Sequence, residues 1–172
     1  MCPVLLWWEM CNQVTESKLF DILQAMARTK KIESVIKYIV NRPDANVTNL
    51  KLQKLLYYCQ AVYLVLHDGS PLFTDKIEAW EYGPVVPSVY QKYKRCKGCI
   101  TEKGSAQLTS KDIEAIDITL DCYGSYSASQ LISAVHAEKP WIEAFDKGRN
   151  TEITTRAMFD YYKTIYSFKD AD

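Results

Sequence analysis

The stretch TNLKLQKLLYYCQAVYLVL, residues 48–66, decides the fold of this chain. Its apolar residues recur at helical spacing and predict one long helix that is capped by Thr48 or Asn49. The residues that share one face are Leu52, Leu55, Leu56, Cys59, Tyr63 and Leu66. Other positions are apolar as well, namely Leu50, Ala61, Leu64 and Val65. A helix that is apolar nearly all round is typical of a buried position, so we expect it at the centre of the protein.

A second helix is predicted on the amino-terminal side of this stretch. Its apolar stripe consists of Ile32, Val35, Ile36, Ile39 and Val40. The sequence Arg-Pro-Asp at residues 42–44 ends it. Residues 1–25 have a different pattern, and a fresh start appears at Met26. We therefore expect 1–25 to be an appendage, either not native to the domain or poorly ordered, and 26–172 to form the domain.

On the carboxyl-terminal side, two short strands are predicted at 72–73 and 77–80, joined around Thr74-Asp75 as a small hairpin. Four further helices follow, marked by capping and proline signals. They are expected at about 87–96, from a cap at Ser110 to Gly124, from Ser127 onward and from Pro140 to Asp146, and a last helix begins at Thr154. The predicted fold is mostly α, a compact domain of about six or seven helices with a small β-hairpin.

The segment WEYGPVVPSVYQKY, residues 80–93, is predicted to be a rigid strand-to-helix corner. Gly83 permits a tight reversal, and Pro84 and Pro87 stiffen the passage into the next helix. A catalytic elbow would present a nucleophile at this turn, and Gly-Pro presents none. The corner is therefore expected to serve the architecture or to form an aromatic docking surface. A preset backbone loses little entropy on binding, which favours the second use.

The composition excludes several classes of function. The 172 residues are 48% hydrophobic and 24% charged, with 21 basic and 21 acidic residues, so the formal net charge is zero. Long-range attraction to nucleic acid or anionic lipid is therefore not expected. No apolar run is long enough to span a membrane, and no secretory signal is present. The cysteines show no disulfide framework. These features predict a cytoplasmic protein with reduced thiols.

Catalytic and cofactor-binding motifs are absent, so no catalytic residue, cofactor or metal ion is predicted. An enzymatic or metal-binding domain that uses His136, Glu138, Cys96 and Cys99 is kept as an alternative. The single CxxC lacks the second pair that a structural zinc site needs, and His136 lacks an evident nucleophile. We expect His136 to lie at a helix end, where the helix dipole favours its protonated form, and Glu138 to face the start of the next helix.

Three segments resemble one protein family. TNLKLQKLLYY at 48–58, WEYGPVVPSVY at 80–90 and HAEKPW at 136–141 are similar to the conserved elements of the SocA-like antitoxin domain, also called the Panacea domain and once labelled phage-associated GepA-like protein. The three occur in the family's order and at suitable separations. The resemblance spans about residues 30–165, and residues 1–25 lie outside it.

This resemblance implies a mostly helical antitoxin of a bacterial or prophage toxin–antitoxin system, with a toxin from an adjacent gene as partner. Family members typically neutralise their toxin by direct binding. An alternative role is that of an adaptor that delivers the toxin to an ATP-dependent protease. DNA binding ranks last, because neither a helix-turn-helix nor a basic excess is present. The motif or partner-binding residues are Trp80, Tyr82, Gly83, Pro84, Pro87, Tyr90, Tyr93, His136 and Trp141.

Overall fold

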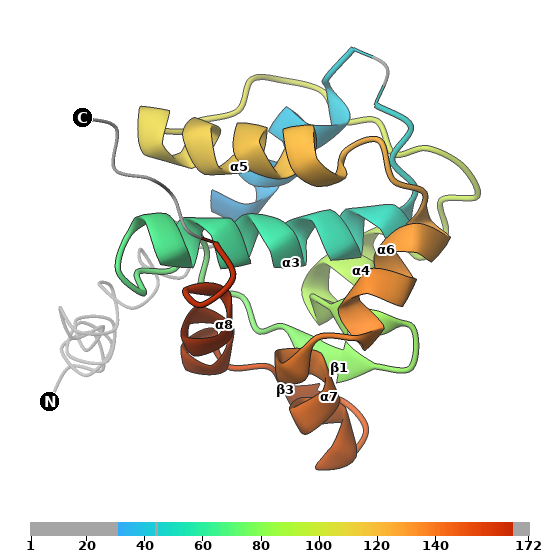
Figure 1. Ribbon diagram of the computed structural model, residues 1–172. Helices are drawn as coiled ribbons and strands as arrows, with labels where there is room; N and C mark the ends of the chain where they lie inside the picture. The colour runs from blue at the N-terminus through green and yellow to red at the C-terminus, as the bar shows by residue number, and fades with distance from the viewer. Residues whose placement is uncertain (1–30, 44, 167–172) are drawn as a thin grey trace, which may run out of the picture.

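Helix α3, Asn49–Leu66, crosses the centre of the computed structural model, which describes residues 31–43 and 45–166 (Figure 1). It packs against α5, Ser110–Tyr123, on one side and against α8, Thr155–Tyr162, on the other. Thr48 caps the helix, since its hydroxyl accepts the Lys51 N–H at 3.3 Å. The predicted central position of this helix is confirmed.

The shorter helices surround α3. Residues 31–40 are helical, and the predicted stripe from Ile32 to Val40 is buried. The remaining helices are α4 at Pro87–Tyr93, α6 at Ala128–His136 and α7 at Lys139–Asp146. The described part of the chain is thus mostly helical with a small sheet, as predicted. None of its helices is long and apolar enough to cross a lipid bilayer. The predicted appendage at 1–25 lies outside the described residues.

Local signals located most of the helix ends correctly. Ser127 and Gln130 form the predicted capping box of α6, and Thr154 caps α8 through the Ala157 N–H. Some boundaries differ from the prediction. The cap of α5 is Thr109, which forms a capping box with Asp112, so Ser110 is already the first helical residue. Helix α4 ends at Tyr93, short of the predicted residue 96.

The hairpin is present and the predicted strand at 77–80 is confirmed as β1, Glu78–Trp80, but its predicted partner at 72–73 was placed wrongly. Strand β1 pairs antiparallel with β2, Gly83–Val85, so Glu81 and Tyr82 form the turn. A two-residue strand, β3 at Thr151–Glu152, pairs with the other side of β1 and gives the order β2-β1-β3. Residues 72–73 are not a strand. Their backbone groups bind the side chain of a buried glutamine on α3 instead of a neighbouring strand.

Candidate functional site

Three buried polar side chains of α3 hold the chain that runs from α3 to α4. The Gln60 amide accepts the N–H groups of Leu72 and Phe73 at 3.0 and 3.2 Å and donates to the Phe73 carbonyl at 3.0 Å. Gln53 accepts the Val86 N–H at 2.9 Å, one residue before α4 begins. The third side chain, Lys54, donates its Nζ to the Pro84 carbonyl at 2.8 Å. The backbone of this connection is therefore fixed by the central helix.

Gly83 follows the hairpin turn and lies against Lys54. Its φ of +94° belongs to the region that favours glycine. A Cβ atom at this position would lie 2.9 Å from Val135 Cγ2 and 3.0 Å from both Lys54 Cε and Nζ. Pro84, the next residue, is buried as well. These two motif residues therefore allow the hairpin to approach α3 and α6 closely.

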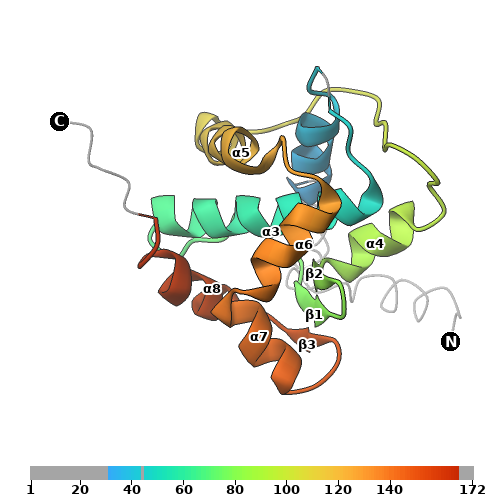
Figure 2. The ribbon, with the colours of Figure 1, turned by 45° about the vertical axis from the view of Figure 1, so that its right-hand side comes forward.

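The last residue of α6 and the first turn of α7 bind the opposite end of the turn. Trp141 Nε1 donates to the Trp80 carbonyl at 3.1 Å. The Trp141 ring stacks between His136, with ring centroids 4.1 Å apart, and Phe145, at 4.8 Å. His136 in turn forms a hydrogen bond with the backbone of Glu81. Side chains from α3, α6 and α7 thus converge on the backbone of residues 80–84, and Figure 2 shows the sheet lying beside α7.

The predicted protonation of His136 is corrected by this packing. His136 is the last residue of α6, as expected, but its pKa is lowered from the usual value. Burial is the main cause, and the nearby ammonium of Lys54 adds to it, whereas the hydrogen bond to the Glu81 backbone acts in the opposite direction. Loss of hydration and a neighbouring cation outweigh the helix dipole, so the neutral imidazole is favoured.

The predicted position of Glu138 is also corrected. Glu138 precedes α7, but its side chain does not cap that helix. The carboxylate accepts hydrogen bonds from the Tyr58 hydroxyl on α3, at 3.0 Å, and from the Tyr162 hydroxyl on α8. Burial raises the pKa of Glu138, and the tyrosine hydrogen bonds oppose that shift. Glu138 therefore links three helices in the interior and is not available as a partner for His136.

An open groove of about 720 Å³ lies on the outer side of the hairpin. Its apolar wall is formed by Leu50, Trp80, Tyr82, Val85, Tyr90 and Phe145. The rings of Trp80 and Tyr90 meet edge to face with centroids 5.0 Å apart. Tyr82, at the tip of the turn, is 63% exposed, and Leu50 is 42% exposed. Arg149 and Asn150 add polar groups from the loop before β3. We name this feature the hairpin groove.

The structure separates the predicted motif residues into two groups. Trp80, Tyr82 and Tyr90 line the hairpin groove. The other residues have internal or supporting roles, because Gly83, Pro84, His136 and Trp141 hold the turn from behind and Pro87 opens α4. Tyr93 does not lie on a binding surface. It is 5% exposed, and its hydroxyl donates to Glu102 in the following loop.

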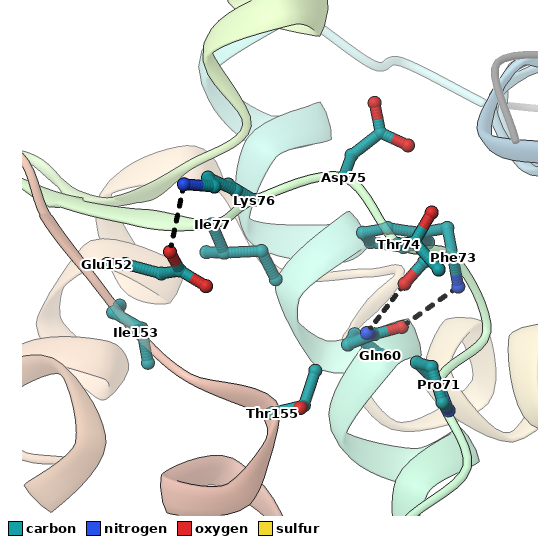
Figure 3. A pocket seen from close by; sticks show the side chains of 10 residues that line it. All are labelled: Gln60, Pro71, Phe73, Thr74, Asp75, Lys76, Ile77, Glu152, Ile153 and Thr155. Carbon is teal, nitrogen blue, oxygen red and sulfur yellow. Dashed lines mark hydrogen bonds and ion pairs between the residues drawn. The ribbon is translucent and has the colours of Figure 1, made fainter. Parts of the chain in front are cut away.

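A second pocket, of about 220 Å³, lies between β3 and the connection from α3 to β1 (Figure 3). Its amide, ammonium and carboxylate groups already have partners within the protein. Gln60 binds the backbone of Phe73, and Lys76 forms an ion pair of 3.4 Å with Glu152 (Figure 3). Asp75 accepts a hydrogen bond from Ser88 at 3.2 Å. The hairpin groove, which combines exposed aromatic rings with apolar side chains, is therefore the stronger candidate for a binding site.

The residues of the metal or enzymatic alternative occupy different environments. Cys96 and Cys99 are exposed in the loop after α4, whereas His136 is packed against Trp141 and Glu138 is bound by tyrosines. Within residues 31–43 and 45–166, no three His, Cys, Asp or Glu side chains cluster as a metal site would require. Cys59 is buried on α3, and burial raises the pKa of its thiol to about 12.

Sequence reasoning missed the role of the polar residues of α3. Gln53, Lys54 and Gln60 are at most 1% exposed, although the pattern alone describes a helix for hydrophobic packing. The sequence contained the information needed to predict this role. A helix that is buried on nearly all sides has no exposed face for Gln53, Lys54 and Gln60, so these polar side chains had to be expected in the interior. Buried polar groups need hydrogen-bond partners, and an irregular connection with free backbone groups supplies them.

Comparison with known proteins identifies the same region. The sequence model of the family described as "Antitoxin SocA-like, Panacea domain" matches residues 52–142. The chain is also 32% identical over 149 residues to Antitoxin SocA of Caulobacter vibrioides (strain NA1000 / CB15N), an alignment that covers 73% of this chain and 75% of the relative. No solved structure matches the chain significantly. The matched residues 52–142 include most of α3, the hairpin and the junction of α6 with α7.

Proposed function

Because this chain belongs to the SocA-like Panacea domain family of antitoxins, we propose that it neutralises a toxin by direct protein–protein binding through the hairpin groove. The observation that carries the proposal is the exposed aromatic and aliphatic wall on a rigid frame. Tyrosine and tryptophan are enriched among the residues that dominate binding energy at interfaces. Trp80 and Tyr82 present such groups on a hairpin that three helices hold from behind, and Tyr90 adds its ring from α4.

The rigidity of the frame favours binding for a further reason. A flexible loop loses conformational entropy when a partner orders it, and that loss reduces affinity. The turn that carries Tyr82 is already fixed by hydrogen bonds to the carbonyls of Trp80 and Pro84. The partner consequently meets a preformed apolar groove, with Arg149 and Asn150 at its polar margin.

The proposal is tested by co-expression with the product of the neighbouring open reading frame. We expect this product to arrest growth when expressed alone, and the antitoxin to restore growth and co-purify with it. A toxic neighbour that is neither bound nor neutralised contradicts the proposal. A toxin that disappears from the cell instead of accumulating in a complex indicates delivery to an ATP-dependent protease.

The groove is tested with matched substitutions. Tyr82→Ala and Leu50→Ala remove exposed side chains from the groove wall, and each should weaken toxin affinity by about tenfold or more, as hot-spot truncations do. Tyr126→Ala is the control, because Tyr126 is also exposed, at 41%, but lies between α5 and α6. Isothermal titration calorimetry gives the affinities. Equal losses in all three variants, or no loss in the groove variants, would place the interface elsewhere.

A further inference from the structure

Two basic side chains lie beneath the hairpin turn, and no carboxylate within residues 31–43 and 45–166 forms an ion pair with either of them. Lys54 reaches the turn from α3 and donates to the Pro84 carbonyl, and it is 0% exposed. His136 reaches it from α6 and binds the backbone of Glu81. Both side chains thus bind backbone groups of the same hairpin, whose outer side forms the hairpin groove, and His136 Nε2 is buried without a partner among the described residues. The bonding described above does not explain why the central helix buries a lysine here.

We propose that Lys54 is a positioning residue for the hairpin groove: its uncharged form holds the turn in the conformation that binds a partner, and its protonation weakens that binding. The inference rests on the proposed function, because it concerns the same groove. Partner binding is then coupled to the loss of a proton from Lys54, a buried residue that the partner does not contact.

The direction of the effect follows from hydrogen bonding and charge. An ammonium has three N–H donors, whereas the Pro84 carbonyl is the acceptor that the described residues provide for Nζ. A neutral amine needs no countercharge and still donates to that carbonyl. Burial lowers the pKa of Lys54 to about 7, so both forms are populated near neutral pH. The charged form is favoured when Nζ reaches water, which requires the turn to move away from α3.

The surrounding groups do not offset this charge. His136, the titratable neighbour on α6, would add a second positive charge if it were protonated. From β2, the neighbours are Gly83 and the carbonyl of Pro84, which carry no charge. Glu138, the carboxylate at the start of α7, is bound by Tyr58 and Tyr162. Burial is accordingly the cause that lowers the pKa of Lys54, with no opposing carboxylate.

The free protein provides the first test, which needs no toxin. The Lys54 side-chain resonance is followed by NMR between pH 5.5 and 11, together with amide exchange of residues 81–86. We expect Lys54 to titrate near pH 7 and, after correction for the intrinsic pH dependence of exchange, the protection of the turn amides to decrease as the pH falls through that value. In Lys54→Met the change in protection should disappear, and in His136→Gln it should remain. A Lys54 resonance that titrates near the usual value of a lysine overturns the proposal even if Lys54→Met does not fold.

The second test measures affinity for the toxin of the neighbouring open reading frame at pH 6, 7, 8 and 9. Wild-type affinity should fall by up to about tenfold for each pH unit below 7, while Lys54→Met should show no such fall. Lys54→Arg, which stays charged, should bind weakly throughout. The same pH profile in wild type and Lys54→Met overturns the inference. If the toxin does not bind at any pH, the proposed function fails, and the free-protein titration still decides the role of Lys54.

Discussion

At the scale of single residues, the hairpin turn is determined by contacts to its backbone. Gly83 has no side chain because Val135 and Lys54 occupy the space where one would lie. The carbonyls of Trp80 and Pro84 accept hydrogen bonds from Trp141 and Lys54. The conformation of the hairpin turn therefore depends on close contacts between its main chain and the side chains of neighbouring helices.

Gly83→Ala should destabilise the protein by about 1–3 kcal/mol, because it combines an unfavourable positive φ with a steric conflict. Gly98→Ala is the matched control. A Cβ there meets nothing within 4 Å, so its effect should stay within about 0.5 kcal/mol. Urea unfolding at pH 8 measures both values. Equal stability of the two variants would show that the approach of Gly83 to Val135 is not needed.

The buried lysine predicts a stability that depends on pH. The unfolded protein holds the Lys54 proton up to the usual lysine pKa, whereas the folded protein releases it near pH 7. Because the unfolded state binds more protons in that interval, stability should rise between about pH 7 and 10, by at most about 1.4 kcal/mol per unit. The difference between wild type and Lys54→Met, followed by urea unfolding, isolates this contribution. A difference that stays constant with pH would contradict it.

At the scale of helices and strands, local signals were reliable and long-range ones were not. Thr48 and Ser127 were predicted as capping residues, because capping joins residues only a few positions apart. The hairpin was misplaced for the opposite reason. Leu72 and Phe73 have an extended, apolar pattern, but their backbone groups bind Gln60, more than ten positions earlier. Whether these backbone groups pair with a strand or with a buried amide side chain depends on the tertiary structure, which a local pattern does not reveal.

Glu138 provides a test at the junction of helices. Glu138→Leu would leave the hydroxyls of Tyr58 and Tyr162 without this acceptor, and it should cost about 2–4 kcal/mol. Glu138→Gln retains one acceptor oxygen and should cost less than half as much. Thermal and urea unfolding at pH 7 compare the two. If the leucine variant is as stable as the glutamine variant, the carboxylate does not hold the three helices together.

At the scale of the whole molecule, α3 organises both the core and the groove. The sequence predicted the central helix and the aromatic residues of the groove, because both depend on residue type along one segment. It did not predict that Tyr93 turns inward or that Phe145 and Arg149 complete the groove wall. Those residues come from α7 and the loop after it, and only the packing of α7 against β1 brings them there.

A central helix that packs against α5, α8 and the hairpin should make unfolding cooperative. Leu56→Ala, at a fully buried position of α3, should destabilise the protein by about 2–5 kcal/mol with a single transition. Leu50→Ala on the same helix, where the side chain is 42% exposed, should cost much less. Far-ultraviolet and near-ultraviolet circular dichroism should report the same midpoint for each variant. Separate midpoints would mean that the helices around α3 unfold independently.

The hydrogen bonds from Trp141 and Lys54 to the turn end on carbonyl groups, which every amino acid possesses. An outward residue such as Tyr82 can therefore be exchanged while the scaffold beneath it keeps its shape. If the hairpin groove binds the toxin as proposed, its specificity can be altered at Tyr82 without loss of the hydrogen bonds that hold the hairpin.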